Sequence, residues 1–150
     1  MRIEVIQHID APLHRVFAVF TDLERAAERI EGIESLGVLT EPPFGVGTRW
    51  TETRRMGGRS SSETMTITAF DPPRSYTAEA RSCGAHYIST FTFEPAGAGT
   101  AVSMSFAGRP TNLLSKLFLI ALGALMRNAV KRMMAKDLAD LQGVCESLGE

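Results

Sequence analysis

The segment from Thr111 to Leu148 constrains the fold of this chain more than any other. In it, adjacent apolar pairs recur every four residues: Leu113/Leu114, Leu117/Phe118, Ala121/Leu122, Leu125/Met126, Ala129/Val130 and Met133/Met134. Such spacing keeps apolar side chains on one side of an α-helix. Thr111 or Asn112 can supply an N-cap oxygen, and Gly149 stands where a helix stop is expected. The pattern therefore predicts one long amphipathic helix, which needs a broad apolar surface to lie on.

A membrane span and a coiled coil are two other interpretations of this segment. The run Leu117–Met126 is almost wholly apolar, but a helix that spans a bilayer needs about 20 such residues. Lys116 and Arg127 bracket the run, and the amphipathic pattern continues beyond it. A coiled coil holds a repeat of about 3.5 residues, whereas these pairs recur at about 3.6 to 4 residues. The sequence thus favours a core helix and no transmembrane segment.

Length and composition are typical of a globular protein. The chain has 150 residues, of which 44% are hydrophobic and 22% charged, so we expect a single domain over residues 1–150. A net charge of −1, without basic runs interleaved with aromatic residues, argues against nucleic acid as a partner. Cys83 and Cys145 lie far apart, and the N-terminus shows no signal peptide pattern. We therefore expect reduced thiols and a cytoplasmic location.

The N-terminal part of the chain predicts one strand and two short helices. Alternating residues in Arg2–Ile9 indicate the strand. Asp10 is a candidate N-cap, and Pro12 suits the first turn of a helix whose apolar residues extend to Phe20. A second short helix is expected to end near Ile30.

Five further strands are predicted in the middle of the chain. They are Thr48–Met56, Ser62–Phe70, Ser75–Ser82, His86–Glu94 and Thr100–Ala107. Tight turns, including Gly57-Gly58 and Cys83-Gly84, separate them and indicate an antiparallel sheet. Val38-Leu39 is interpreted as part of a connection. The predicted order is strand, helix, helix, five strands, helix, which defines an α+β protein. A sheet with one apolar face and a helix with one apolar stripe are expected to meet, with the sheet strongly curved around the helix.

A series of short motifs resembles a known family. The motifs are Ile9-Asp10-Ala11-Pro12 with Val16-Phe17, Gly45-Val46-Gly47-Thr48-Arg49-Trp50, Phe70-Asp71-Pro72-Pro73-Arg74, Phe91-Thr92-Phe93-Glu94-Pro95 with Gly99-Thr100, and Asp137-Leu138-Ala139-Asp140-Leu141. In this order they resemble the polyketide cyclase/dehydrase branch of the START-like (SRPBCC, helix-grip) superfamily over essentially the whole chain. The resemblance implies a curved antiparallel sheet of six to seven strands around the long helix, with a deep apolar cavity between them. It does not imply one activity, because the fold hosts binding proteins, lipid carriers, co-chaperone domains and enzymes.

Several charged residues fall on a strand face that should be apolar. Glu52 and Arg54 share the face of Trp50, and Glu63 shares that of Met65. If this face points into the cavity, a pair between Arg54 and either Glu63 or Glu52 is expected, because an unpaired charge is costly in a low-dielectric pocket. Alternatively, the sheet splays near its hairpin and leaves these charges in water. The sequence leaves both interpretations open.

A set of aromatic, methionine and polar side chains is expected to line the cavity and bind a ligand. The set is Trp50, Glu52, Arg54, Glu63, Met65, Tyr76, Tyr87, Phe91, Met104, Leu122, Met126 and Met133. Tyrosine hydroxyls can hydrogen-bond a ligand oxygen, and methionine suits an adaptable wall. Each of these side chains also fits an ordinary core.

The sequence predicts neither a metal nor a cofactor. His8, His14 and His86 lack a carboxylate or a second histidine at ligand spacing. No G-x-S-x-G motif or phosphate-binding loop is present. His86 is a candidate general base if it lies at the mouth of the pocket, although lone histidines are usually structural or exposed.

Three classes of function fit this sequence. The first is binding, for transport or sequestration, of a small hydrophobic molecule such as a lipid, an isoprenoid or an aromatic polyketide. The second is a polyketide cyclase, aromatase or dehydratase, with acid and base drawn from Glu52, Arg54, Glu63, His86 and Tyr87. In the third, the basic stretch Arg54–Arg59 or the apolar helix start contacts a partner or, transiently, a membrane. Monomer and homodimer, the ligand and any catalytic residues are left open.

Overall fold

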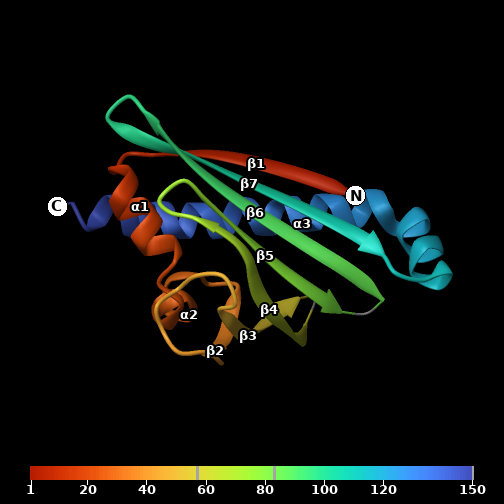
Figure 1. The fold of residues 1–150 in the computed structure, drawn as a ribbon. Coiled ribbons are helices and arrows are strands. Elements are labelled where there is room, and N and C mark those ends of the chain that lie inside the picture. The colour runs from red at the N-terminus through yellow and green to blue at the C-terminus, as the bar shows by residue number, and fades with distance from the viewer. Residues whose placement is uncertain (57, 83, 150) are drawn as a thin grey trace.

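The computed structural model describes residues 1–56, 58–82 and 84–149 of the chain. Its elements are β1 (Arg2–Ile9), α1 (Leu13–Phe20), a 3-10 turn (Leu23–Arg25), α2 (Ala26–Arg29), β2 (Ile33–Val38), β3 (Arg49–Met56), β4 (Arg59–Asp71), β5 (Ser75–Ser82), β6 (Ala85–Ala96), β7 (Gly99–Pro110) and α3 (Leu113–Ser147) (Figure 1). Of the predicted turns, Gly57 and Cys83 lie outside the described residues. Their neighbours Gly58 and Gly84 have φ of 81° and 74°, a region that favours glycine.

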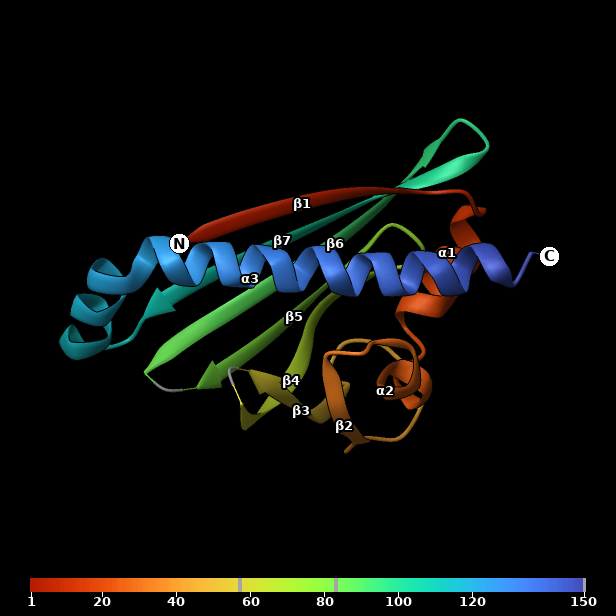
Figure 2. The same ribbon diagram turned by 180° about the vertical axis from the view of Figure 1, so that it is seen from behind.

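The strands form one antiparallel sheet in the order β1-β7-β6-β5-β4-β3-β2. Consecutive strands from β2 to β7 are neighbours, and β1 pairs with β7, so β1 and β2 form the two edges. Figure 2 shows α3 running along one face of this sheet, with α1 and α2 near its C-terminal end. The predicted helix-grip fold is thereby confirmed, with seven strands.

Strand β2 is the element that the sequence pattern did not identify. Residues 33–38 pair with β3, with Val38 opposite Trp50, and the register shifts between Ile33 and Ser35. Four of its six residues are exposed, so the strand carries no clear alternation of apolar and polar residues. A short edge strand of this kind is set by pairing with its neighbour and not by its own composition.

The start of α1 also differs from the prediction. Pro12 occupies the N-cap position, and no side chain caps the helix. The backbone N–H of Asp10 instead donates to Oε2 of Glu146 over 2.9 Å. Asp10 therefore ties the β1–α1 connection to the last turns of α3.

The packed core lies at the end of the sheet where α1 meets the second half of α3. Rings of α1 and β6 pack edge to face, with centroids 5.2 Å apart for both Phe17–Phe93 and Phe20–Phe93. Met134 and Leu138 of α3 are fully or almost fully buried. Burial of each such side chain stabilises the fold by about 1.5–3 kcal/mol. This end of the molecule is therefore the closely packed base of the fold.

Helix α3 lies against the core along its second half only. The helix begins as predicted at the cap of Asn112, whose Oδ1 accepts from the N–H of Ser115 over 2.8 Å. Its buried residues, however, all lie from Met134 onward, whereas Leu114 is 79% exposed and Leu125 69%. The prediction that the whole helix lies on an apolar surface is thus wrong for the first half. The physical reason is that this half passes over a cavity and carries apolar residues on its outer side as well.

Candidate functional site

A cavity of about 940 Å³ lies between the sheet and α3. Strands β2 to β7, the α2 region and both halves of α3 contribute to its wall. On β6 the contributing residues are Ala85, Tyr87, Ser89 and Phe91. This is the period of two that a strand imposes, so one face of β6 lines the cavity and the other faces away.

Most of the residues predicted to line the cavity do so. These are Trp50, Glu52, Arg54, Glu63, Met65, Tyr76, Tyr87, Phe91, Met104, Met126 and Met133. Their role in ligand binding remains a prediction. Leu122 is the exception, because it is 39% exposed and does not line the cavity. Leu119, Met126 and Met133 of α3, seven residues apart, line the cavity. Leu122 comes three residues after Leu119 and four before Met126, so helical spacing alone would place it on the same side.

His86 does not lie at the cavity. It alternates with the cavity residues Ala85 and Tyr87 and so projects from the other face of β6. There, Nε2 of His86 lies 2.7 Å from Oε1 of Glu79. The condition under which His86 was a candidate general base, a place at the mouth of the pocket, is therefore not met, and His86 has Glu79 as its hydrogen-bond partner instead.

Glu52 and Arg54 of β3 point into the cavity and are paired. Nε of Arg54 donates to Oε2 of Glu52 over 2.6 Å, and its Nη2 donates to Oδ2 of Asp137 over 2.7 Å. The three side chains are between 11% and 17% exposed. Nε1 of Trp50 donates to the second oxygen of Glu52 over 3.1 Å. Of the two interpretations left open by the sequence, the one with charges inside the cavity is the one observed, with the Arg54–Glu52 pair formed.

Asp137 is the member of this cluster that sequence reasoning missed. It comes from α3, 83 residues from Arg54 in the chain. The signal was present as a carboxylate within the buried stripe of Met134, Leu138 and Leu141. A buried aspartate on an apolar stripe needs a partner, but the sequence does not indicate which strand supplies it.

Gly32 makes room for the pair between Arg54 and Asp137. A Cβ at this position would lie 3.1 Å from Nη1 of Arg54 and 3.6 Å from Oδ1 of Asp137. Any larger side chain would therefore press on the ion pair. Because Gly32 has no side chain, the loop between α2 and β2 can pack closely against the cluster.

Burial and pairing oppose one another at this cluster. Burial lowers the pKa of Arg54, but the hydrogen bond and charge of Asp137, with the charge of Glu52, outweigh it, and the pKa lies above its ordinary value. Burial raises the pKa of the Asp137 carboxyl, and the hydrogen bond from Arg54 opposes this rise. The guanidinium therefore remains charged and holds the two carboxylates in place.

Glu63 lies directly opposite Glu52 across β3 and β4. Burial and the charge of Glu52 raise the pKa of the Glu63 carboxyl, while a hydrogen bond from Ser82 and the charge of Arg54 oppose the rise. Like charges directly opposite one another on a sheet are destabilising. Glu63 therefore takes up a proton at a higher pH than an ordinary glutamate.

Replacing Glu63 with glutamine is expected to stabilise the protein at neutral pH. The pKa of Glu63 in the folded state lies above its ordinary value of 4.5. Above pH 4.5 the folded state therefore retains this proton more readily than the unfolded state, and the free energy of unfolding falls as the pH rises through the folded-state pKa. Glu63→Gln should be more stable than wild type at pH 7, by at most about 1 kcal/mol, and the difference should vanish below pH of about 4. Urea denaturation at both pH values measures it. Glu41→Gln, at an exposed site, is the control, and an equal gain in that variant would contradict the explanation.

The two tyrosines of the cavity wall differ in their surroundings. The hydroxyl of Tyr76 donates to the backbone oxygen of Phe20 over 3.5 Å, and its ring stacks on Phe91 with centroids 4.8 Å apart. Burial raises the pKa of Tyr76. The Tyr87 ring stacks on Phe106 at 5.5 Å. Tyr76 therefore forms part of the packed wall, and Tyr87 lies further toward the first half of α3.

No metal centre is apparent in the part of the chain that the structure describes, since no three His, Cys, Asp or Glu side chains are grouped to hold an ion.

The basic stretch at the β3–β4 hairpin is also not a continuous surface patch. Arg55 and Arg59 are exposed, whereas Arg54 points inward to Asp137.

A curved antiparallel sheet that grips a long C-terminal helix around an apolar cavity defines the helix-grip class of proteins. The chain belongs to the family described as polyketide cyclase / dehydrase and lipid transport, whose profile matches residues 1–146. This confirms the family expected from the sequence motifs. No curated protein matches the chain.

Solved structures share the fold at low sequence identity. TTHA0849 from Thermus thermophilus has a TM-score of 0.84 and 20% identity, covering 100% of both chains. Zhui aromatase/cyclase from Streptomyces sp. R1128 has a TM-score of 0.80 and 17% identity, covering 100% of this chain and 96% of that one. Ara h 8.0201 has a TM-score of 0.74 and 17% identity, covering 98% of each chain. The family and these neighbours support a polyketide cyclase/dehydrase-like or ligand-binding fold.

Proposed function

We propose that this protein binds a small hydrophobic molecule, such as a lipid, an isoprenoid or an aromatic polyketide, in the cavity between sheet and α3. The observation that carries the proposal is a cavity of about 940 Å³ whose wall is mostly apolar, with a few polar groups gathered in one region. Small-molecule sites commonly have volumes of about 300–1,000 Å³ and this composition. Methionines at positions 65, 104, 126 and 133 allow the wall to adapt to its ligand.

The charges of the wall favour a neutral ligand. Among the described residues, the charged side chains that line the cavity are Glu52, Arg54, Glu63 and Asp137, three acids and one base. Arg54 donates three hydrogen bonds to Glu52 and Asp137, and a guanidinium has five N–H groups. A ligand hydroxyl or carbonyl can therefore accept from Arg54, whereas an anionic ligand would meet the surrounding carboxylates.

Binding of a neutral apolar fluorophore tests this proposal. N-phenyl-1-naphthylamine should bind with one-to-one stoichiometry and brighten as it leaves water. A long-chain alcohol should displace it at least about tenfold more effectively than the fatty acid of equal length, a difference of about 1.4 kcal/mol. Absence of probe binding would contradict a ligand cavity, and preference for the acid would contradict the neutral ligand. Native mass spectrometry of protein from its own host, followed by denaturing extraction, identifies a bound molecule.

A second candidate function is cyclisation or dehydration of a polyketide-like substrate. The observation that favours it is Glu63, whose raised pKa suits a general acid and which shares the cavity with Arg54 and Tyr87. Incubation with a poly-β-ketone thioester analogue, analysed by mass spectrometry, tests it. Turnover that survives in Glu63→Gln at the wild-type rate would remove Glu63 from the mechanism, and no turnover at all leaves binding as the function.

A further inference from the structure

The first half of α3 exposes apolar side chains on a scale not found elsewhere in the described chain. Among the residues whose exposure the structure describes, ten large apolar side chains are more than half exposed, and six of them lie here. We call these six the outer face of α3: Leu113, Leu114, Leu117, Phe118, Ile120 and Leu125. Spacings of four and seven residues place them on two adjacent stripes of the helix. Scattered exposed apolar residues need no explanation, but a continuous patch usually marks a site of contact.

The charged residues of the sequence along this face all have one sign. From Arg109 to Lys136 there is no Asp or Glu, and there are six cations, Arg109, Lys116, Arg127, Lys131, Arg132 and Lys136, of which Lys136 is paired with Glu31 and Asp140. Leucine and phenylalanine together with Lys and Arg, without acids, are typical of helices that lie in the interface of anionic membranes. The same charges disfavour a second copy of this chain, because pairing the two outer faces would bring like charges together.

The helix is held to the body of the protein in an orientation that suits a surface and not a span. By length and composition α3 qualifies as a membrane-crossing helix, with an 18-residue stretch of mean hydropathy 1.6 of which 6% is buried. However, Nη1 of Arg127 donates to the backbone oxygen of Arg2 over 2.6 Å, and Met134 and Leu138 are buried in the core. For α3 to span a membrane, its first half would have to move away from β1. Lying flat requires no rearrangement.

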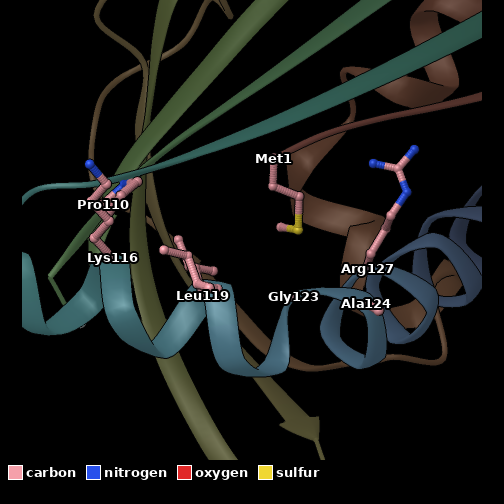
Figure 3. A pocket seen from close by; sticks show the side chains of 8 residues that line it. Met1, Pro110, Lys116, Leu119, Gly123, Ala124 and Arg127 are labelled. Carbon is pink, nitrogen blue, oxygen red and sulfur yellow. The ribbon is translucent and has the colours of Figure 1, made fainter.

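A groove beside the outer face offers a place for a lipid headgroup. It has a volume of about 340 Å³ and is lined by residues of α3, Met1 and Pro110. Figure 3 shows Lys116 and Arg127 on opposite sides of this groove, with Leu119 and Gly123 between them. A Cβ at Gly123 would meet nothing within 4 Å. Two cations flanking an apolar groove match a phosphate with its acyl chains.

We propose that the outer face of α3 docks the protein on an anionic lipid surface, with the helix lying in the plane of the interface. Leu114, Leu117 and Phe118 belong both to this face and to the lining of the large cavity. The mouth of the cavity therefore opens where the lipid surface would lie. That a ligand passes between membrane and cavity by this route rests on the proposed function, whereas docking itself does not.

Flotation with lipid vesicles tests the proposal on the full chain. The protein should float with vesicles of phosphatidylcholine and phosphatidylglycerol, and about tenfold less with phosphatidylcholine alone. Binding should fall in 0.5 M salt, because salt screens the charge contacts. Leu113→Gln/Leu125→Gln should bind at least about tenfold more weakly, since two leucines leave the interface. Neither leucine lines a described cavity, and glutamine retains helix propensity.

The matched control is Ile6→Gln/Val46→Gln. Ile6 and Val46 are 65% and 69% exposed, close to the 71% of Leu113 and the 69% of Leu125, but they lie outside α3. Equal binding by the two double variants would overturn the proposal, as would a protein that forms concentration-dependent dimers and does not float. Resistance of vesicle-bound protein to carbonate extraction would overturn the in-plane orientation in favour of a span.

Fluorophore binding without vesicles separates the two proposals, because the Leu113→Gln/Leu125→Gln variant should retain it. A wild type that floats but binds no fluorophore would leave docking standing and remove the proposed function.

Discussion

Replacing Arg54 with methionine is expected to lower the free energy of unfolding by about 3–5 kcal/mol at pH 7, because it leaves two buried carboxylates without their cation. Asp137 and Glu52 are 11% and 16% exposed and both depend on this guanidinium. For a domain of this size the loss corresponds to a fall in Tm of roughly 10 °C. Thermal and urea denaturation measure it directly.

Variants of the partner residues show whether pairing is the cause. Asp137→Asn should cost less, about 1–2 kcal/mol, since Arg54 keeps Glu52 and the amide oxygen still accepts a hydrogen bond. The double variant Arg54→Met/Asp137→Leu should recover part of the loss, because only Glu52 then remains and Trp50 donates to it. Arg55→Met changes the next residue of β3, which is exposed, and serves as the matched control. A similar loss in Arg55→Met would mean that the cost comes from the strand and not from the ion pair.

Filling the middle of the cavity is expected to abolish most ligand binding. Ala78 and Ser89 face one another across β5 and β6, both are buried, and both line the cavity. Ala78→Phe/Ser89→Phe places two rings in the space where a ligand would lie. Affinity for the neutral fluorophore should fall roughly 100-fold, equivalent to about 2.7 kcal/mol. The fold should tolerate the change to within about 1.5 kcal/mol, because the rings enter open volume instead of a packed core.

The opposite face of the same strands supplies the control. Thr77 and Thr90 are the neighbouring cross-strand pair, with their hydroxyl oxygens 3.4 Å apart, and they do not line the cavity. Thr77→Phe/Thr90→Phe adds the same rings on the other side of the sheet and should leave binding unchanged within twofold. Unchanged binding in Ala78→Phe/Ser89→Phe would show that the fluorophore binds elsewhere, for instance on the outer face of α3.

Periodicity along the chain was sufficient to predict the order of most elements and the face of β3 that carries Trp50, Glu52 and Arg54. Both are local properties, since a strand alternates and a helix turns in the same way wherever it lies. The short edge strand β2 was missed because its pairing with β3, and not its own composition, defines it. The motifs were likewise sufficient for the family, because caps and turns recur at fixed places in a fold.

Tertiary structure alone decided which surfaces meet. A helix with apolar residues on several sides does not specify which of them faces the sheet, so Asp137 was not recognised as the partner of Arg54, and Leu122 was placed in the cavity although it lies outside it. Likewise, the alternation of β6 separates His86 from Tyr87 but does not say which of the two faces inward. The curvature of the sheet settles these points, because it leaves an open space beneath the first half of α3 and a packed core beneath the second. Curvature arises from pairing among seven strands along the whole chain, and no single segment encodes it.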